Sequence, residues 1–240
     1  MQVEGAVALV TGGGRRLGQA IAVALGESGA RVAVHYSRSQ VGAADTAATI
    51  RAAGGEAIIL QADLTSAQQA VRLVESASDH MGPVEVLINN ASIFQKRTLP
   101  ETTAEDWDRH FAVHVRAPFL LAQAMRSGLP AGRKGKIVSM NDWNTARPER
   151  FAYGASKAAL SGLTRSLALA LAPDIEVSEV ALGAILPPSD MTDLKPEKGV
   201  LGPAGRMGSV DEVAGAVLAL IRNDYISGVT LHVDGGRHLR

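Results

Sequence analysis

The stretch Thr11–Gly18, TGGGRRLG, lies between two apolar runs, AVALV (6–10) and AIAVAL (20–25). This order is typical of a strand that passes through a glycine-rich loop into a helix, and such loops cradle phosphate groups. The spacing departs from the common GxGxxG pattern, because Leu17 stands where the last glycine would be. The loop also carries Arg15 and Arg16, whose positive charge suits an anionic ligand.

Outside this loop, short β-rich runs alternate with longer alanine-rich segments along the whole chain. Such alternation predicts a parallel sheet with helices on both faces, and no Pro/Ser/Gly-rich linker divides the chain. The expected strands span 7–11, 31–36, 57–61, 84–89, 136–140, 176–181 and 230–233. The expected helices span 17–28, 41–53, 67–81, 104–127, 152–171 and 210–221. The proline-containing segment 183–208 fits neither class and is expected to form a substrate-binding loop, the alternative being a disordered insertion.

The composition excludes several classes of protein. The 240 residues include 24 basic and 24 acidic side chains, so a general surface for nucleic acid or anionic membrane is not expected. Aromatic residues make up only 4%, which disfavours a base-stacking platform. Cysteine is absent, so neither disulfides nor thiolate metal ligands exist, and no metal site is expected. With no leader-like segment and no long apolar run, we expect a cytoplasmic protein.

The segment HYSRS (35–39) ends the second expected strand, about 20 residues beyond the glycine loop. Proteins that bind NAD usually carry Asp or Glu there to hold the ribose hydroxyls, and this segment has none. His35, Tyr36, Arg38 and Ser39 instead offer the basic and hydroxyl groups that suit the 2′-phosphate of NADP. The alternative is a solvated, mildly basic turn.

Two further segments follow strands in the same way. Asp63, in LQADLT (60–65), is placed to accept a hydrogen bond from an adenine amino group. The segment LINNAS (87–92) ends the fourth strand with small and amide residues that leave room for a ribose. Each signal is modest alone, and their order along one α/β chain strengthens the prediction of a dinucleotide site.

The segment YGASK places Tyr153 and Lys157 four residues apart on an expected helix, so both side chains lie on one face. A tyrosine has a pKa of about 10, and a nearby ammonium would lower it, which makes the phenol a usable proton donor. The same ammonium would hold the ribose of a nicotinamide. The alternative is an ordinary pair of residues on a helix surface.

With these motifs, the chain resembles the short-chain dehydrogenase/reductase family from end to end. The segments that carry the resemblance are TGGGRRLG, QADL, NNAS, YGASK and VDGG. The resemblance implies a single doubly wound Rossmann domain over residues 1–240, hydride transfer with a nicotinamide cofactor, a small-molecule substrate and a homotetramer.

Several positions depart from the usual pattern of that family. Arg16 stands where the family usually has glycine, and His114 where it usually has asparagine. Asp142, in IVSMND (137–142), takes the place of the catalytic serine, although its distance to Tyr153 is two residues shorter than usual. The alternative for Asp142 is a residue that only caps a turn. His114 would either join a proton relay with Lys157 or be a buried structural histidine.

This set of departures resembles the pteridine reductases, including the bacterial dihydromonapterin reductases. The shared features are Arg16, the HYxRS segment, Asp142, an aromatic residue after the amide motif (here Phe94) and the ending DGGRHLR. The resemblance implies an NADPH-dependent reductase of dihydromonapterin, dihydrobiopterin or dihydrofolate. Phe94 would stack on the pterin, and Arg16 would lie between the cofactor pyrophosphate and the substrate.

The chemistry of Asp142 favours the same interpretation. Reduction of a carbonyl develops negative charge on oxygen, which a carboxylate would repel, whereas a C=N nitrogen must gain a proton. Tyr153 is then the expected proton donor, with Lys157 and Asp142 assisting it. One alternative is a carbonyl or 3-oxoacyl thioester reductase, which a substitution of Asp142 by serine would distinguish from a pteridine reductase. The other is a non-catalytic NADP-sensing protein.

The expected catalytic residues are Tyr153, Lys157, Asp142 and His114. The expected cofactor-binding residues are Gly12, Gly14, Arg15, Arg16, Leu17, His35, Tyr36, Arg38, Ser39, Asp63, Leu64, Asn90, Ala91, Ser92, Tyr153, Lys157, Gly183 and Ile185. The expected substrate-binding residues are Arg16, Ser92, Phe94, Asp142 and Tyr153.

Overall fold

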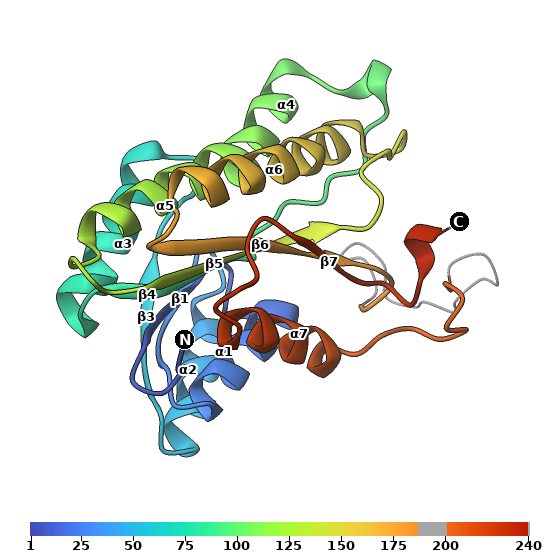
Figure 1. Ribbon diagram of the computed structural model, residues 1–240. Helices are drawn as coiled ribbons and strands as arrows, with labels where there is room; N and C mark the ends of the chain where they lie inside the picture. Colours follow the sequence, from blue (N-terminus) through green and yellow to red (C-terminus); the bar gives the residue numbers. More distant parts are fainter. Residues whose placement is uncertain (187–200, 240) are drawn as a thin grey trace.

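A seven-stranded parallel sheet forms the centre of the molecule, in the order β3-β2-β1-β4-β5-β6-β7 (Figure 1). The computed structural model describes residues 1–186 and 201–239. The strands are β1 (Val7–Val10), β2 (Arg31–Tyr36), β3 (Glu56–Gln61), β4 (Val84–Asn89), β5 (Gly135–Asp142), β6 (Ile175–Leu182) and β7 (Thr230–Val233). The predicted doubly wound α/β fold with seven parallel strands is therefore confirmed.

Helices cover both faces of the sheet (Figure 1). On one face lie α1 (Arg16–Glu27), α2 (Gln40–Ala52) and α7 (Val210–Arg222), and on the other α3 (Ala67–Met81), α4 (Ala104–Phe111), α5 (Ala117–Gly128) and α6 (Phe151–Ala170). Short 3₁₀ turns span Leu99–Glu101 and Arg237–Leu239. Each face has its own apolar core, because the strands carry buried side chains on both sides. None of the described helices is both long and apolar enough to cross a membrane.

The strand order reverses at β1, which pairs with β2 on one side and β4 on the other. Connections after β1 and β4 therefore leave the sheet in opposite directions and open a crevice at its carboxyl edge, where doubly wound folds bind ligands. The glycine loop and the segment after β4 meet at this crevice. The topology thus places both predicted binding segments side by side.

The single helix predicted over 104–127 is interrupted. α4 and α5 are joined by a π-helical segment, Ala112–Arg116, in which the Ala117 N–H donates to Ala112 O. The physical reason is Pro118, which has no N–H and whose ring would clash with the carbonyl of His114 in a regular α-helix. The wider turn relieves this clash and places His114 in the interior, where it is 1% exposed.

β5 is longer than predicted and ends at Asp142, which pairs in register with Leu182 of β6. Asp142 is thus the last residue of a strand, not a member of the following loop. In the predicted substrate-binding loop 183–208, residues 187–200 lie outside the described part of the chain.

Candidate active site

A cleft of about 1990 Å³ runs along the carboxyl edge of the sheet, from the glycine loop to Asp142 and Tyr153. Most of the predicted site residues line it: Gly12, Gly14, Arg15, Arg16, Leu17, His35, Tyr36, Arg38, Ser39, Asp63, Leu64, Asn90, Ala91, Ser92, Phe94, Asp142, Tyr153 and Gly183. Ile185 does not, because its side chain packs in the core against Gly208. Lys157 and His114 lie behind the wall of the cleft, buried at its catalytic end.

Arg16 has an unusual backbone conformation. Its φ is 53°, the only positive value at a non-glycine residue in the described ranges. The left-handed region costs an L-residue about 1–2 kcal/mol, which explains why the wider family prefers glycine there. An exposed arginine held at this cost points to a role for its guanidinium.

His35 does not belong to the basic cluster predicted at the end of β2. It is 1% exposed, and burial lowers its pKa to about 4, so the ring is neutral at pH 7. Nδ1 accepts a hydrogen bond from the Gly12 N–H at 3.0 Å, and Nε2 lies 3.1 Å from Ala62 O. His35 is therefore a structural residue that connects the glycine loop to β2 and to the end of β3. The positive charge at this end of the cleft comes from the exposed Arg15, Arg16 and Arg38.

Asn90 also supports the glycine loop. Its side-chain Nδ2 donates to Thr11 O at 2.9 Å and to Gly12 O at 3.2 Å. Gly18 packs so closely here that a Cβ would come within 2.4 Å of Asn90 Nδ2. The amide therefore fixes the shape of the loop, while its neighbours Ala91 and Ser92 line the cleft.

Asp142 and Tyr153 are in direct contact, although they are closer in sequence than the family spacing suggests. The Tyr153 hydroxyl donates to Asp142 Oδ2 at 2.9 Å. Arg147 binds the same carboxylate in a bidentate pair, with Nε at 3.1 Å from Oδ2 and Nη2 at 2.8 Å from Oδ1. The Asn144 N–H donates to Oδ1 at 3.0 Å, so Asp142 does cap a turn, but it also faces the phenol.

The electrostatics of Tyr153 correct one prediction. Burial and the Asp142 carboxylate raise its pKa well above the usual value of 10.0, rather than the lysine lowering it. Arg147 and Arg150 oppose this shift. The phenol is therefore fully protonated at neutral pH, and the nearest stabilisation for a phenolate comes from these two arginines.

Lys157 lies beneath the tyrosine. The residue is 4% exposed, and its ammonium donates to Met140 O at 2.7 Å and lies 5.9 Å from the centre of the Tyr153 ring. Burial lowers its pKa to about 8, against the opposing effects of Asp142 and Glu179. The residue is thus a buried, partly titrating cation at the base of the site.

Phe94 forms part of the cleft wall beside the phenol. Its ring meets the Tyr153 ring edge-on, with centroids 4.6 Å apart. The Arg150 guanidinium covers one face of Phe94 at 3.7 Å, and its Nη1 donates to Phe94 O at 2.7 Å. Arg150 therefore fixes both the ring and the backbone of the residue predicted to stack on substrate.

His114 has both ring nitrogens bonded to protein. The Ile93 N–H donates to Nε2 at 3.2 Å, so Nε2 is unprotonated and Nδ1 carries the hydrogen, which it donates to Ser156 Oγ at 2.8 Å. Ser92 Oγ lies 2.9 Å from Nε2. Burial, aided by Lys157 and His110, lowers the pKa of His114 well below 6.5. These contacts fit the structural alternative and leave no ring nitrogen for the predicted relay.

The roles of three residues of the site were not predicted from the sequence. Neither Arg147 nor Arg150 is among the catalytic or binding residues expected from the sequence. Glu179 is a buried carboxylate that accepts from Asn141 Nδ2 at 2.8 Å, Ser161 Oγ at 2.7 Å and Thr230 Oγ1 at 2.7 Å. The segment IEVSEVAL (175–182) contains Glu176 and Ser178 as well as Glu179, so the sequence gives no distinct signal for this buried carboxylate.

Comparisons with known proteins agree with this geometry. Residues 6–198 match the family described as short chain dehydrogenase. The chain is 39% identical to FolM alternative dihydrofolate reductase 1 from Brucella canis, solved in complex with NADP, with a TM-score of 0.92 over 100% of this chain and 96% of that one. It is 34% identical to a 3-oxoacyl-[acyl-carrier-protein] reductase from Synechocystis, covering 96% of each chain. It is 36% identical to an uncharacterized oxidoreductase from Methylorubrum extorquens, covering 98% of each.

Proposed function

Because the chain belongs to the short-chain dehydrogenase/reductase family of oxidoreductases, we propose that it is an NADPH-dependent reductase of pteridines of the dihydromonapterin, dihydrobiopterin or dihydrofolate type. The observation that carries this proposal is the carboxylate of Asp142, 2.9 Å from the Tyr153 hydroxyl and held there by Arg147. The solved FolM neighbour, named a dihydrofolate reductase, supports it.

The residues at the far end of the cleft fit NADPH. Arg15 and Arg38 are exposed there beside Ser39, and no carboxylate stands at the end of β2 to repel a 2′-phosphate. The glycine loop, held by His35 and Asn90, presents its backbone to a pyrophosphate. When bound, NADPH supplies the hydride for the reduction.

Tyr153 provides the proton. Hydride addition to the carbon of a C=N bond sends the π electrons to nitrogen, which forms its N–H bond with the Tyr153 proton as the O–H bond breaks. The phenolate left behind lies near Arg147 and Arg150, both of which lower the pKa of Tyr153, and it recovers its proton from solvent. Before the reaction, Asp142 accepts a hydrogen bond from the Tyr153 hydroxyl and so holds the phenol at the cleft wall.

Substrate binding follows from the same residues. Phe94 lines the cleft with one face covered by Arg150, so a flat heterocycle would stack on the opposite face. Asp142 can accept hydrogen bonds from an aminopyrimidine ring, and Arg16 offers donors to ring oxygen or nitrogen. Exposed Trp107 and Phe119, on α4 and α5, support the further proposal of a homotetramer, which light scattering would test.

A ketone or 3-oxoacyl thioester is the second candidate substrate, favoured by the Synechocystis relative. An assay of NADPH oxidation with dihydropterins, dihydrofolate and a panel of ketones separates the two, with Tyr153→Phe as the blank. Turnover confined to pterins is expected, and turnover confined to ketones would refute the proposal. Tight NADPH binding without any turnover would instead favour the non-catalytic alternative.

Variants at position 142 sharpen the assay. Asp142→Asn keeps the shape of the side chain but removes its charge, and Asp142→Ser restores the usual family residue. We expect both to lower pterin turnover by roughly 100-fold and the serine variant alone to gain ketone reduction. Unchanged pterin turnover in Asp142→Asn would show that the carboxylate is not used.

A further inference from the structure

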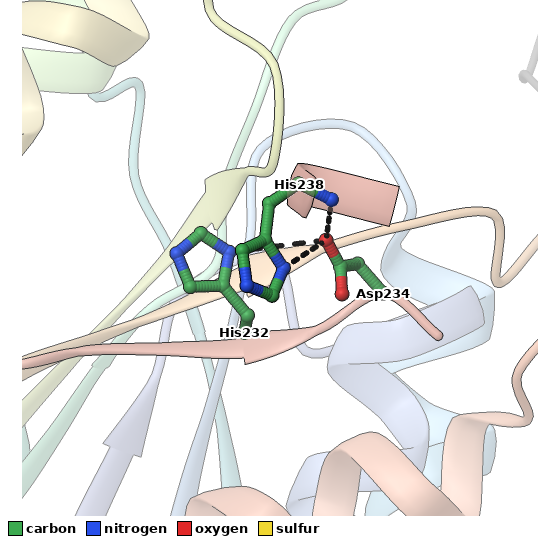
Figure 2. Close-up of side chains that lie close together, drawn as sticks. All are labelled: His232, Asp234 and His238. Carbon is green, nitrogen blue, oxygen red and sulfur yellow. Dashed lines mark hydrogen bonds and ion pairs between the residues drawn. The ribbon is translucent and has the colours of Figure 1, made fainter. Parts of the chain in front are cut away.

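Two histidines and an aspartate meet where β7 leads into the C-terminal 3₁₀ turn Arg237–Leu239 (Figure 2). His232 lies on β7, Asp234 directly follows the strand, and His238 lies in the turn. One nitrogen from each histidine and one carboxylate oxygen all lie within 4.8 Å of one another. The rings of His232 and His238 lie against each other, and Asp234 Oδ2 lies near a nitrogen of each, with both imidazoles exposed to solvent and Asp234 buried.

The distances are near those of a metal site. His238 Nδ1 lies 2.8 Å from Asp234 Oδ2, and His232 Nδ1 lies 3.9 Å from the same oxygen. Bonds of roughly 2.1 Å to a tetrahedral ion require ligand atoms about 3.4 Å apart. The two separations bracket this value. The imidazole rings are stacked with centroids 3.9 Å apart, so His232 must turn about its Cβ–Cγ bond to direct its lone pair at a shared ion.

Asp234 is already held in place. Its Oδ1 accepts from the Gly236 N–H at 2.9 Å, and its Oδ2 accepts from the His238 N–H at 2.7 Å. Behind it, Gly183 packs so tightly that a Cβ would come within 2.5 Å of Asp234 Cα. These backbone contacts leave Oδ2 with one further lone pair, which now faces the His238 ring.

We propose that His232, Asp234 and His238 bind a divalent transition-metal ion of the zinc class. Two imidazole nitrogens and a carboxylate oxygen match the ligand preference of Zn²⁺, and water would complete the coordination. Each imidazole binds through its lone pair as the neutral ring, and a proton on Nδ1 leaves or moves to Nε2. No residue of this set takes part in the proposed reduction.

The site lies close to the catalytic end of the cleft. Arg237, between Gly236 and His238, places its guanidinium over the ring of Trp143 at 4.6 Å, and Trp143 directly follows Asp142. An ion that joins His238 to β7 would fix the turn that carries Arg237. Binding of the metal ion would therefore also order the loop beside the active site, through the contact between Arg237 and Trp143.

Calorimetric titration of the chelator-treated full chain with Zn²⁺ tests the proposal, together with Co²⁺ titration followed by the visible bands of tetrahedral cobalt. The variants are His232→Asn and His238→Asn, and His80→Asn is the matched control because that exposed histidine on α3 lies outside the cluster. Asp234 is left unchanged, since it also caps the turn. Thermal unfolding without metal verifies that each variant is folded.

We expect one ion per chain, tetrahedral cobalt bands, and an affinity that falls roughly 10-fold or more in each cluster variant but not in His80→Asn. Zn²⁺ should also raise the melting temperature of the wild type and not of folded His238→Asn. Absence of binding to the wild type would overturn the proposal. So would equal binding in the cluster variants, or an equal loss in His80→Asn. These readouts involve no substrate, so they stand apart from the test of the reductase.

Discussion

Lys157 is a buried cation at the base of the proposed active site, where its charge is costly to the fold. The residue is 4% exposed, and burial lowers the pKa of its ammonium from 10.5 to about 8. Below pH 8 the folded protein therefore holds a buried cation that the unfolded chain exposes to water. Replacement by methionine, which has a similar length and no charge, removes this cost.

The size of the effect follows from the two pKa values. The fall in the pKa of Lys157 from 10.5 to about 8 costs the folded state about 3 kcal/mol near pH 7, since each tenfold change in the protonation equilibrium is worth about 1.36 kcal/mol. A base with a lower pKa in the folded state binds fewer protons folded than unfolded, so stability rises with pH between about 8 and 10.5. Loss of the bond to Met140 O offsets about 1–3 kcal/mol of the gain in Lys157→Met.

Urea unfolding of wild type and Lys157→Met at several pH values measures this balance. We expect the variant to be inactive and at least as stable as the wild type near pH 7. The wild type should then gain about 1.3 kcal/mol relative to the variant between about pH 7 and pH 9. A stability difference that does not change over this interval would refute the assigned burial cost. Lys157→Arg, which stays charged throughout, is the control and should show no such gain.

Three further predictions concern the loop, the ion pair and the buried histidine. Arg16→Gly relieves the positive φ, so urea unfolding should show stability unchanged or up to about 1 kcal/mol higher, while the KM values for NADPH and substrate rise roughly 10-fold. Arg147→Met removes both hydrogen bonds to Asp142, so it should lower the free energy of unfolding by about 1–3 kcal/mol and also lower turnover. Arg147→Lys should restore stability only in part, because lysine cannot form a bidentate pair with a carboxylate. His35 has a pKa of about 4 when folded, so the unfolded chain binds its proton first and stability should fall by up to about 3 kcal/mol as pH drops from about 6.5 to 4. Acid unfolding of His35→Gln, which cannot take up that proton, should show a shallower loss.

The fold was predictable because its signals are local. Runs of buried strand residues alternate with helical segments, and the seven strands follow from that pattern with boundaries within two residues. The break between α4 and α5 was missed although Pro118 is visible in the sequence, because a proline inside a long helical pattern does not say whether the helix stops, bends or widens.

The sequence predicted which residues belong to the candidate site better than it predicted the hydrogen bonds that they make. Asp142 and Tyr153 were expected to act together, and they meet because β5 runs on to Asp142 before the chain turns back into α6. The neutral ring of His35 accepts from the Gly12 N–H, and the bidentate bond of Arg147 to Asp142 depends on the path of residues 143–150. Neither contact has a fixed spacing in the sequence, so no sequence motif predicts it.

The π-helical segment Ala112–Arg116 makes the length of this helix as important as its composition. A π turn holds one residue more than the α turn it replaces, and each residue of an α-helix turns the chain by about 100°. Removal of a single residue here would return Pro118 to a regular α-helical turn, where its ring would clash with the carbonyl four residues before it. His114 would lose Ser92 and Ser156 in the same step. We therefore expect a deletion in this segment to be tolerated less well than a substitution of Arg116, its one exposed residue.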